Sequence, residues 1–337
     1  MNRSPDAQRR DAAGAEGVRG RGHEPRGRHR PAQAGRRDHE VGRRTGRPHP
    51  RGPGARRAPA EPPDRLSSLV DASGVTLAMP RPPRRIVSLI PSITETLCSL
   101  GLADALVGVT VYCVEPRAAL RGKTKIGGEK DPDLAAIRAL APDLVVANVE
   151  ENVREHIATL REWGIPVWVT YPRTVADGLA MIRELGEVTD SRARADALLA
   201  ELEPLYARVR AESAARRPVP VFYPIWRNPW MTIGRDTYVH DLLAVCGAAN
   251  VFADRAERYP SLTLDEMAAR KPEVIVLPDE PFRFRRAHLA DFAPYGDVPA
   301  VRDGRLHLVD GKPFSWHGPR IGDALRTLPA LFGGPHG

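Results

Sequence analysis

The sequence predicts an α/β protein made of two related lobes that a long helical segment joins. Strand-like and helix-like runs alternate over residues 66–174, residues 175–217 are almost all helix formers, and the alternation then restarts. The segments ALAPDLVVA (139–147) and ARKPEVIVL (269–277) repeat one layout, in which a helix leads through Pro and an acidic residue into a buried strand. We therefore expect an N-terminal lobe at 66–174, a helical connector at 175–217 and a C-terminal lobe at 218–332.

Residues 1–65 differ from the rest of the chain in composition. They carry 17 arginines, no lysine and eight acidic residues, whereas the remainder has 33 basic and 34 acidic residues. This Arg/Gly/Pro-rich stretch has almost nothing apolar to bury, so we expect a disordered basic tail. A spacer, or a start codon placed too far upstream, explains it more simply than an arm that contacts RNA or a membrane. The near-neutral remainder does not suggest nucleic-acid binding by the folded part.

The first lobe is expected to open with a strand and a capped helix. RIVSLI (85–90) is rich in β-branched residues and predicts a strand that ends at Pro91. Ser92 and Glu95 have the spacing of a capping box, so we expect Ser92 to cap a helix that ends at Gly101. The other elements expected in this lobe are strands at 106–110, 123–128, 144–148 and 166–171, a helix capped by Asp131 with Pro132 at its first position, and a helix at 150–163.

The connector and the second lobe follow the same rules. Residues 175–217 read as two helices with a break near 189–191, and the second is more than twenty residues long. Pro204 is the one strong helix breaker in it and marks a candidate kink. In the second lobe we expect strands at 219–226, 273–278 and 305–310 and helices at 238–246, 263–270 and 321–332.

Sequence features also bear on location and on the cysteines. No apolar segment of a secretory signal follows Met1, and no run approaches the ~18–20 apolar residues of a membrane span. As written, the chain is therefore expected in the cytoplasm, or in the periplasm or at the cell surface if its start is misassigned. Cys98, Cys113 and Cys246 are scattered, which favours small buried apolar residues over disulfides or a zinc site.

Aromatic and polar residues gather where the predicted strands end. Open α/β sheets bind ligands beyond the carboxyl ends of their strands, so these positions form the candidate site. Aromatics make up only 6% of the chain, yet three of its five tryptophans fall here. Such a mixture suits a large, flat, partly apolar ligand. The candidate ligand-binding residues are Tyr112, Asn148, Tyr171, Trp226, Asn228, Trp230, Trp316 and His317.

Catalytic patterns are weak in comparison. The sequence has no G-x-S-x-G elbow and no P-loop. Glu150 and Glu151 could form an acid/base pair, but adjacent carboxylates at a helix start more often interact with the helix dipole. His317, in the string PFSWHGPR (313–320), either contacts a ligand or coordinates a metal carried by that ligand, and both readings stay open. No catalytic residue and no metal ligand are assigned.

The order of these motifs resembles a known family. RRIVSLIPSITETLCSLG (84–101), KIGGEKDPDLAAIRALAPDLVVAN (125–148) and DLLAVCGAANVF (241–252) are similar to the class III periplasmic-binding-protein family, the receptors for vitamin B12, haem and iron chelates. The likeness extends from about residue 70 to 330 and is greatest to the cobalamin-binding branch, the helical-backbone metal receptors.

That resemblance implies two Rossmann-like lobes, a single long helix between them and a ligand held in a cleft between the lobes. It implies a monomer that binds cobalamin or a similar metal chelate, has no intrinsic cofactor and catalyses nothing. Receptors of this kind deliver their ligand to an ABC-transporter permease through one glutamate on each lobe. The matching positions here are Asp265, with Glu266 beside it, and Ala135, which has no carboxylate. An enzyme that acts on a tetrapyrrole or cofactor in the same cleft is the alternative.

Overall fold

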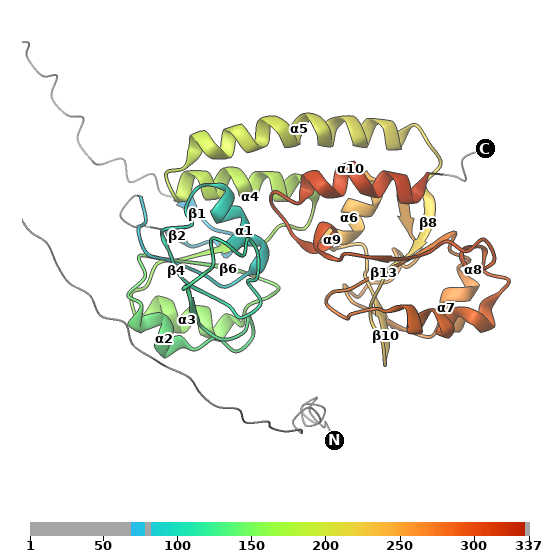
Figure 1. The fold of residues 1–337 in the computed structure, drawn as a ribbon, viewed down its shortest axis with the longest axis horizontal. Coiled ribbons are helices and arrows are strands. Elements are labelled where there is room, and N and C mark those ends of the chain that lie inside the picture. Colours follow the sequence, from blue (N-terminus) through green and yellow to red (C-terminus); the bar gives the residue numbers. More distant parts are fainter. Residues whose placement is uncertain (1–68, 78–81, 334–337) are drawn as a thin grey trace, which may run out of the picture. The chain divides into compact units, whose positions relative to one another are not determined.

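The computed structural model describes residues 69–77 and 82–333. The basic tail expected at residues 1–65 lies outside the described residues. The contacts divide the chain into Met1–Pro62 and Pro63–Gly337, and every element below belongs to the second unit. Within it, two parallel sheets with their covering helices form two lobes. Three helices lie along one side of the lobes: α4 (Val175–Val188), α5 (Arg192–Ala214) and α10 (Ile321–Phe332) (Figure 1).

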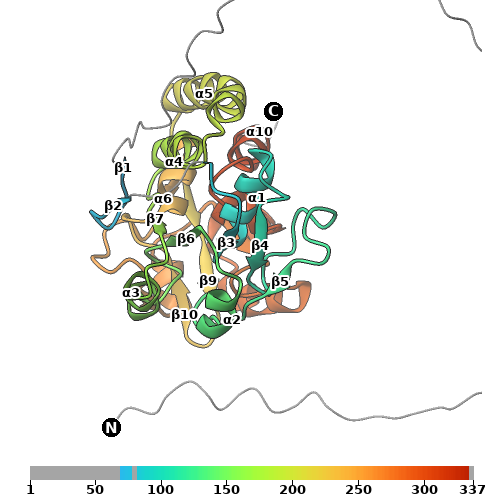
Figure 2. The same cartoon turned by 90° about the vertical axis from the view of Figure 1, so that its left-hand side faces the viewer.

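The first lobe is built on a five-stranded parallel sheet with the strand order β5-β4-β3-β6-β7 (Figure 2). The chain starts in the middle with β3, adds β4 and β5 on one side, and then adds β6 and β7 on the other. Such an order creates a switch point between β3 and β6, where doubly wound sheets bind ligands. The strands are β3 (Ile86–Ser88), β4 (Leu106–Val109), β5 (Thr124–Lys125), β6 (Leu144–Asn148) and β7 (Val167–Thr170), and a short antiparallel pair precedes them, β1 (Leu69–Val70) and β2 (Thr76–Leu77).

The first helix of this lobe starts differently from the prediction. α1 (Pro91–Ser99) has proline in its first turn, and no side chain caps it. The prediction of a capping box formed by Ser92 and Glu95 was therefore wrong, because the helix begins at Pro91 and not after it. Ser92 is buried inside the first turn, and Glu95 pairs instead with Arg320 of the second lobe at 2.8 Å.

The next two helices begin later than predicted. α2 (Leu134–Ala139) is capped by Asp133, whose carboxylate accepts the backbone N–H of Ala136 at 2.9 Å, so the assignment of Asp131 as the cap was wrong. α3 (Arg154–Glu162) starts four residues after the expected position. Residues 149–153 form a turn instead, which side-chain bonds of two asparagines at its ends hold in place.

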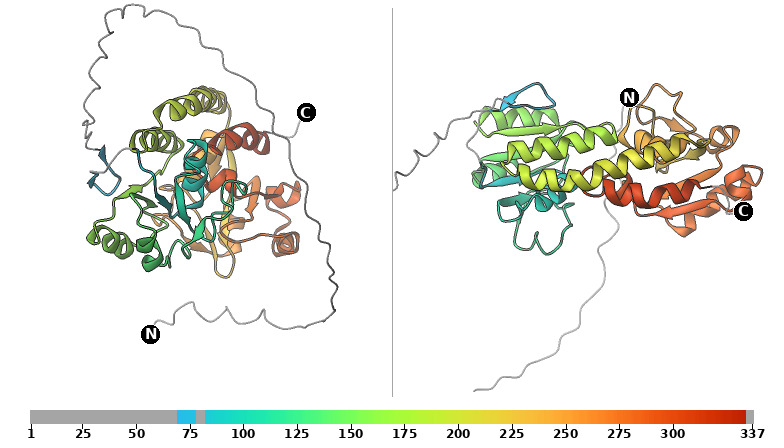
Figure 3. Two further views of the ribbon diagram at one scale, coloured as in Figure 1. Left: turned by 60° about the vertical axis from the view of Figure 1, so that its left-hand side comes forward. Right: turned by 90° about the horizontal axis from the view of Figure 1, so that it is seen from above.

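The connector consists of two helices, as predicted. α4 (Val175–Val188) ends at the expected break, and α5 (Arg192–Ala214) continues through Pro204. Pro204 lies on the exposed side of α5, where the backbone carbonyl that it leaves without a partner can reach water. α5 packs against both α4 and the last helix, α10 (Ile321–Phe332), as Figure 3 shows from above. The long helix therefore contacts the helical layer of each lobe.

The second lobe contains a four-stranded parallel sheet and a three-stranded antiparallel sheet. The prediction of a single strand at 219–226 was wrong, because this segment contributes to both sheets. Its first half belongs to the parallel sheet and its second half to the antiparallel sheet. The parallel sheet has the order β11-β8-β13-β14, with β11 (Ala248–Asn250), β8 (Val219–Phe222), β13 (Val274–Pro278) and β14 (Leu306–Val309). The antiparallel sheet has the order β12-β10-β9, with β12 (Ser261–Leu262), β10 (Trp230–Thr232) and β9 (Pro224–Trp226).

The helices of the second lobe match the predicted positions closely. Thr263 and Glu266 form the capping box of α7 (Leu264–Ala269), in which each side chain accepts the other residue's backbone N–H. The helix expected at 321–332 is confirmed with the same ends. The helices of this lobe, besides α10, are α6 (Tyr238–Val245), α7 (Leu264–Ala269), the 3-10 helix η2 (Arg286–Tyr295), α8 (Pro299–Arg302) and α9 (Lys312–Ser315).

One hydrophobic core extends through both lobes. It includes the strands of the first sheet, the inner faces of α4 and α5, and residues of β8, α6 and α10 in the second lobe. On α5 the buried residues follow helical spacing: Ala195, Leu199, Leu202, Leu205 and Val209. A second, smaller core around Phe252 and Phe292 lies wholly in the second lobe. The shared core fixes the two lobes to the same helical layer.

Candidate functional site

Large apolar side chains are exposed on the loops where strands end. Of the ten that are exposed in the described part of the chain, six lie on the loops that follow β4 and β6, at the end of β9, or on the loop between β11 and β12. They are Val111, Tyr112, Val114, Val149, Trp226 and Tyr259. The predicted residues Tyr112 and Trp226 are 51% and 43% exposed and belong to different lobes. An apolar surface at the strand ends of both lobes is the kind that partly apolar ligands cover.

Asn148 shapes its turn and does not face solvent. It is 3% exposed, and its side-chain carbonyl accepts the backbone N–H of Glu150 at 2.8 Å. Its amide nitrogen donates to Thr170 Oγ1 at 3.3 Å. Asn152 completes the turn by accepting the backbone N–H of Asn148 at 2.9 Å. In this structure Asn148 thus positions the loop that carries Glu150.

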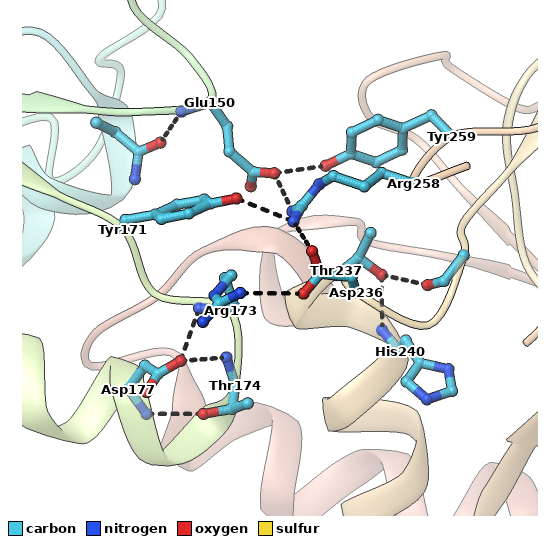
Figure 4. A network of polar contacts seen from close by, with 12 residues as sticks. Glu150, Tyr171, Arg173, Thr174, Asp177, Asp236, Thr237, His240, Arg258 and Tyr259 are labelled. Carbon is cyan, nitrogen blue, oxygen red and sulfur yellow. Dashed lines mark hydrogen bonds and ion pairs between the residues drawn. The ribbon is translucent and has the colours of Figure 1, made fainter. Parts of the chain in front are cut away.

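Arg258 of the second lobe reaches across to the first lobe (Figure 4). Its guanidinium forms an ion pair with Glu150 and donates to the hydroxyl of Tyr171 at 3.0 Å. Within its own lobe it also pairs with Asp236 at 2.7 Å. Only about a quarter of the Arg258 side chain is exposed, and 20% of the Glu150 side chain. The predicted residue Tyr171 is therefore engaged by an interlobe ion-pair network.

Two further contacts extend this network. Tyr259 donates its hydroxyl to Glu150 at 3.2 Å, and burial, with the charge of Glu150 nearby, raises the pKa of Tyr259 to about 12. Arg173 lies over the Tyr171 ring, with 5.4 Å between the guanidinium carbon and the ring centroid, and pairs with Asp236 at 3.4 Å. Tyr171 is held between two arginines in this way.

An aromatic cluster surrounds the β9–β10 hairpin. The Trp226 ring packs edge-on against Phe282 with centroids 5.6 Å apart, and Trp230 stacks on Phe284 at 5.7 Å. Trp230 is only partly exposed, so it supports the hairpin more than it faces solvent. Asn228, at the hairpin tip, is exposed and has a φ of 63°, in the left-handed region that asparagine tolerates better than most residues.

The string PFSWHGPR joins the lobes. Gly318 has a φ of 111° and lies so close to α1 that an added Cβ would sit 2.2 Å from Thr96 Oγ1. Arg320 pairs with Glu95 of α1 and lies over the Trp316 ring at 5.0 Å from its centroid. Trp316 itself is 7% exposed. The structure places Trp316 within the packing between the lobes, unlike the exposed Trp226.

His317 is partly buried beside Trp316. It packs edge-on against Tyr238 of α6 with centroids 4.5 Å apart. Its Nδ1 is buried and has no hydrogen-bond partner among the described residues, as is also true of the Tyr238 hydroxyl. Burial lowers the pKa of His317 to about 4, which keeps the ring neutral near neutral pH. Around it and elsewhere in the described ranges, no cluster of three or more His, Cys, Asp or Glu side chains could hold a metal ion.

Of the two glutamates considered for catalysis, Glu150 has other partners, and a third acidic residue, Glu129, lies on a neighbouring loop. Glu150 is held by Arg258 and Tyr259, as described above. Burial, with a contribution from Glu151, raises the pKa of Glu129 to about 7. Asn152 donates to the Glu129 backbone carbonyl at 3.0 Å, so the two loops pack together. Glu129 follows the strand predicted at 123–128 but was not among the predicted site residues.

The positions matched to transporter docking occupy equivalent places in the two lobes. Asp265 in the first turn of α7 is exposed and accepts a hydrogen bond from Tyr295 at 2.8 Å. Glu266 beside it is engaged in the α7 capping box and in an ion pair with Arg255. Ala135 takes the same place in the first turn of α2 and is exposed. The two helix starts therefore present different chemistry.

We expect the ion pair between Arg258 and Glu150 to contribute measurably to stability. Both side chains are largely buried, so removing one partner strands a charge, and Arg258→Met should lower the free energy of unfolding by about 2–4 kcal/mol. Urea unfolding of Arg258→Met, Glu150→Gln and the double variant measures the coupling directly.

The control for this cycle is the exposed pair of Arg217 and Glu273. It is bidentate at 2.9 and 2.8 Å, yet the arginine side chain is 68% exposed, so its coupling should stay below about 1 kcal/mol. Equal coupling energies in the two cycles would show that the interlobe pair is no more than a surface contact.

Comparison with known proteins identifies the family. The family model described as periplasmic binding protein matches residues 86–313. The vitamin B12-binding protein of Vibrio parahaemolyticus serotype O3:K6 (strain RIMD 2210633) is 27% identical over 256 residues, which are 75% of this chain and 90% of that protein.

Solved structures share the two-lobe fold. The periplasmic vitamin B12 binding protein BtuF of Vibrio cholerae gives a TM-score of 0.68 at 22% identity and covers 75% of this chain and 98% of its own. The periplasmic heme-binding protein RhuT from Roseiflexus sp. RS-1 gives a TM-score of 0.65 at 25% identity, and the match covers 74% of this chain and 97% of that protein. The fold predicted from the sequence is thereby confirmed, and this chain belongs to the periplasmic binding protein family.

Proposed function

We propose that this chain is a binding protein for a large, partly apolar metal chelate, that is, a corrinoid such as cobalamin, a haem or a ferric siderophore. The observation that carries the proposal is the set of exposed apolar side chains at the strand ends of both lobes, with Tyr112 on one and Trp226 on the other. Aromatic side chains supply flat contact area at low conformational cost. The relatives are named as vitamin B12-binding and haem-binding proteins, which supports the same ligand class.

A receptor explains the site better than an enzyme that acts on such a ligand. Members of the family are binding proteins. Glu150, the first candidate for an acid or base, is held by Arg258 and Tyr259. His317 packs edge-on against Tyr238, and its Nδ1 is buried. Glu150 and His317 thus serve the ion pairs and the packing between the lobes. The chelate is bound as a ligand of the protein and is not an intrinsic cofactor.

We also propose that the chain acts outside the cytoplasm and serves an ABC-transporter permease. The matched family is described as periplasmic binding protein and the two solved structures are named as periplasmic proteins, which favours the periplasm over the cytoplasmic location expected from the sequence as written. None of the helices in the described ranges is long and apolar enough to cross a membrane. A permease would meet a carboxylate at Asp265 of one lobe and the methyl group of Ala135 on the other, so docking would be unequal between the lobes.

Calorimetric titration tests the proposal. Cyanocobalamin, ferric protoporphyrin IX and a ferric hydroxamate siderophore are each titrated into the full chain. Binding of one of them at micromolar or lower concentration, with an unchanged ligand recovered afterwards, is the expected result. No binding of any of the three would overturn the proposal, and chemical conversion of the bound ligand would favour the enzyme.

Trp226 provides the sharpest site test. We expect Trp226→Ala to weaken chelate binding by about 1–3 kcal/mol, because the exposed ring loses its contact area with the ligand. Calorimetry is the primary measurement, since coloured ligands quench tryptophan fluorescence by absorption alone. Trp163→Ala is the matched control: Trp163 is 37% exposed but follows α3, away from the strand ends, and its removal should leave affinity unchanged. Equal losses in both variants would contradict a ligand contact at Trp226.

A further inference from the structure

The short hairpin of β1 and β2 lies against the open edge of β7 (Figure 2). β7 is the last strand in the order β5-β4-β3-β6-β7, so only one of its sides pairs with another strand of that sheet. The carbonyls of Pro166 and Thr170 accept backbone N–H groups from β6 and the loop after it, at 2.8 and 3.0 Å. Because backbone groups alternate along a strand, those of Val167 and Val169 point away from β6, toward the hairpin.

Asp71 joins the hairpin to that edge. Its Oδ2 accepts the backbone N–H of Val169 at 3.1 Å, and the N–H of Ala72 donates to the Val169 carbonyl at 3.0 Å. The carboxylate oxygen thus takes the place that a carbonyl of a neighbouring strand has in a ladder. Asp71 Oδ1 accepts the backbone N–H groups of Ser73 and Val75 at 2.9 and 3.0 Å, which fixes the turn of the hairpin. One side chain, only 1% exposed, therefore both shapes the hairpin and attaches it to the sheet.

Arg161 of α3 occupies the next part of the edge. Its guanidinium pairs with Asp71 Oδ2 at 2.6 Å and donates to the carbonyl of Val167 at 3.2 Å. It also donates to the Ser73 hydroxyl at 3.1 Å. The carbonyl of Val167 and both backbone groups of Val169 thus have partners outside the sheet. An edge whose backbone groups are occupied in this way is closed to another strand.

The two edges of this sheet are protected in different ways. β5, at the opposite edge, has only two residues, and Lys123 and Lys125 give it charges that discourage pairing. β7 has four residues, and the segment VWVTY (167–171) is β-branched or aromatic throughout and carries no charge. A segment of this composition pairs readily with copies of itself when its edge is open. The hairpin therefore supplies the protection that the composition of β7 lacks.

We propose that residues 69–77 are an edge cover, which Asp71 and Arg161 hold on β7, and that a second copy of this chain pairs with β7 when the cover is released. Two β7 edges can meet antiparallel about a two-fold axis, since each then presents the same groups to the other. The hairpin is suited to be a separable cover, because its contacts with the hydrophobic core come from the partly buried Leu69 and Leu77. The proposal concerns self-association and does not depend on which ligand the protein binds.

Asp71→Asn in the full chain tests the cover. The amide keeps the size of the carboxylate but has one oxygen instead of two, so it cannot accept from both the hairpin turn and Val169, and the charge of Arg161 loses its partner. Size-exclusion chromatography with light scattering should show a dimer at a protein concentration at least about tenfold lower than for wild type. Circular dichroism checks that the variant is folded. Arg161→Gln removes the other half of the anchor and should shift association in the same direction.

Asp196→Asn is the matched control. Asp196 is exposed on α5, so this variant makes the same change in net charge far from the hairpin in the sequence and should behave as wild type. Hydrogen exchange locates the interface: the Val169 amide should exchange about tenfold faster in dilute Asp71→Asn protein than in wild type, and should be protected again as the dimer forms. A variant that stays as monomeric as wild type, or a dimer that leaves Val169 exchange unchanged, would overturn the proposal.

Native-state hydrogen exchange on the wild-type protein tests the cover without any substitution. The amides of Val75 and Val169 both bond Asp71, so they should exchange through one local opening. That opening should be more frequent than the one that exposes Val145 of β6, which lies between two strands. Exchange of Val169 only through global unfolding would show that the hairpin is an integral part of the sheet, and the edge cover would then be rejected.

Discussion

Trp316→Ala is expected to lower the free energy of unfolding by about 3–5 kcal/mol. The indole is 7% exposed and lies where the string PFSWHGPR packs between the lobes, so truncation leaves a cavity that rigid neighbours fill only in part. It also removes the ring under the Arg320 guanidinium, which pairs with Glu95 of the other lobe. Urea or thermal unfolding of the purified variant measures the loss.

Trp226→Ala separates the two roles that a tryptophan can have at this site. Trp226 is 43% exposed, so its removal should change stability by less than about 1 kcal/mol although it weakens ligand binding. For Trp316→Ala, any loss of affinity should follow from the lower stability and disappear under conditions that keep the variant folded. A stable Trp316→Ala protein that binds no ligand would instead place Trp316 directly on the ligand.

The second large effect concerns pH and His317. Burial lowers the pKa of this histidine to about 4, whereas an unfolded chain has a value near 6.5. Between these values the unfolded chain binds a proton that the folded protein does not. The corresponding stability is complete above about pH 6.5 and is lost as the pH falls toward 4, with a total of about 3 kcal/mol.

His317→Phe should remove this dependence while keeping a ring against Tyr238. Unfolding free energies of both proteins are measured from pH 4 to pH 8, and the difference between them should change by about 3 kcal/mol in favour of the variant at the acidic end. Glu129→Gln is the control of opposite sign. The pKa of Glu129 is raised to about 7, so its contribution is present at low pH and is lost as the pH rises from about 4.5 to 7. A parallel pH profile for wild type and His317→Phe would show that His317 titrates normally.

The sheets and the connector could be predicted because their signals are local. Buried parallel strands read as continuous apolar runs such as LVVAN and EVIVLP, and helix formers fill the connector. The first residues of three helices, Pro91, Leu134 and Arg154, could not be predicted as well. Several residues near each start satisfy the same capping preferences, and turn hydrogen bonds from the rest of the lobe decide among them.

The site could be predicted in part for the same reason. Strand ends locate Tyr112 and Trp226, but the direction in which a side chain points depends on tertiary packing, and Trp316 points inward. The sequence analysis did not identify Arg258 as a site residue. Its partner Glu150 is 108 residues away in the sequence, and a local sequence pattern cannot indicate a pair at that separation.

The hydrophobic core shared by the two lobes has a consequence for cooperativity. Since the inner faces of α4 and α5 pack on residues of both lobes, neither sheet could lose its structure without exposing apolar surface on the other's supporting helices. The two lobes therefore make up one folding unit, although each has the strand order of a separate domain. A ligand bound across them would protect the amide hydrogens of both sheets, and destabilising changes in either lobe would lower the population of the whole binding-competent protein.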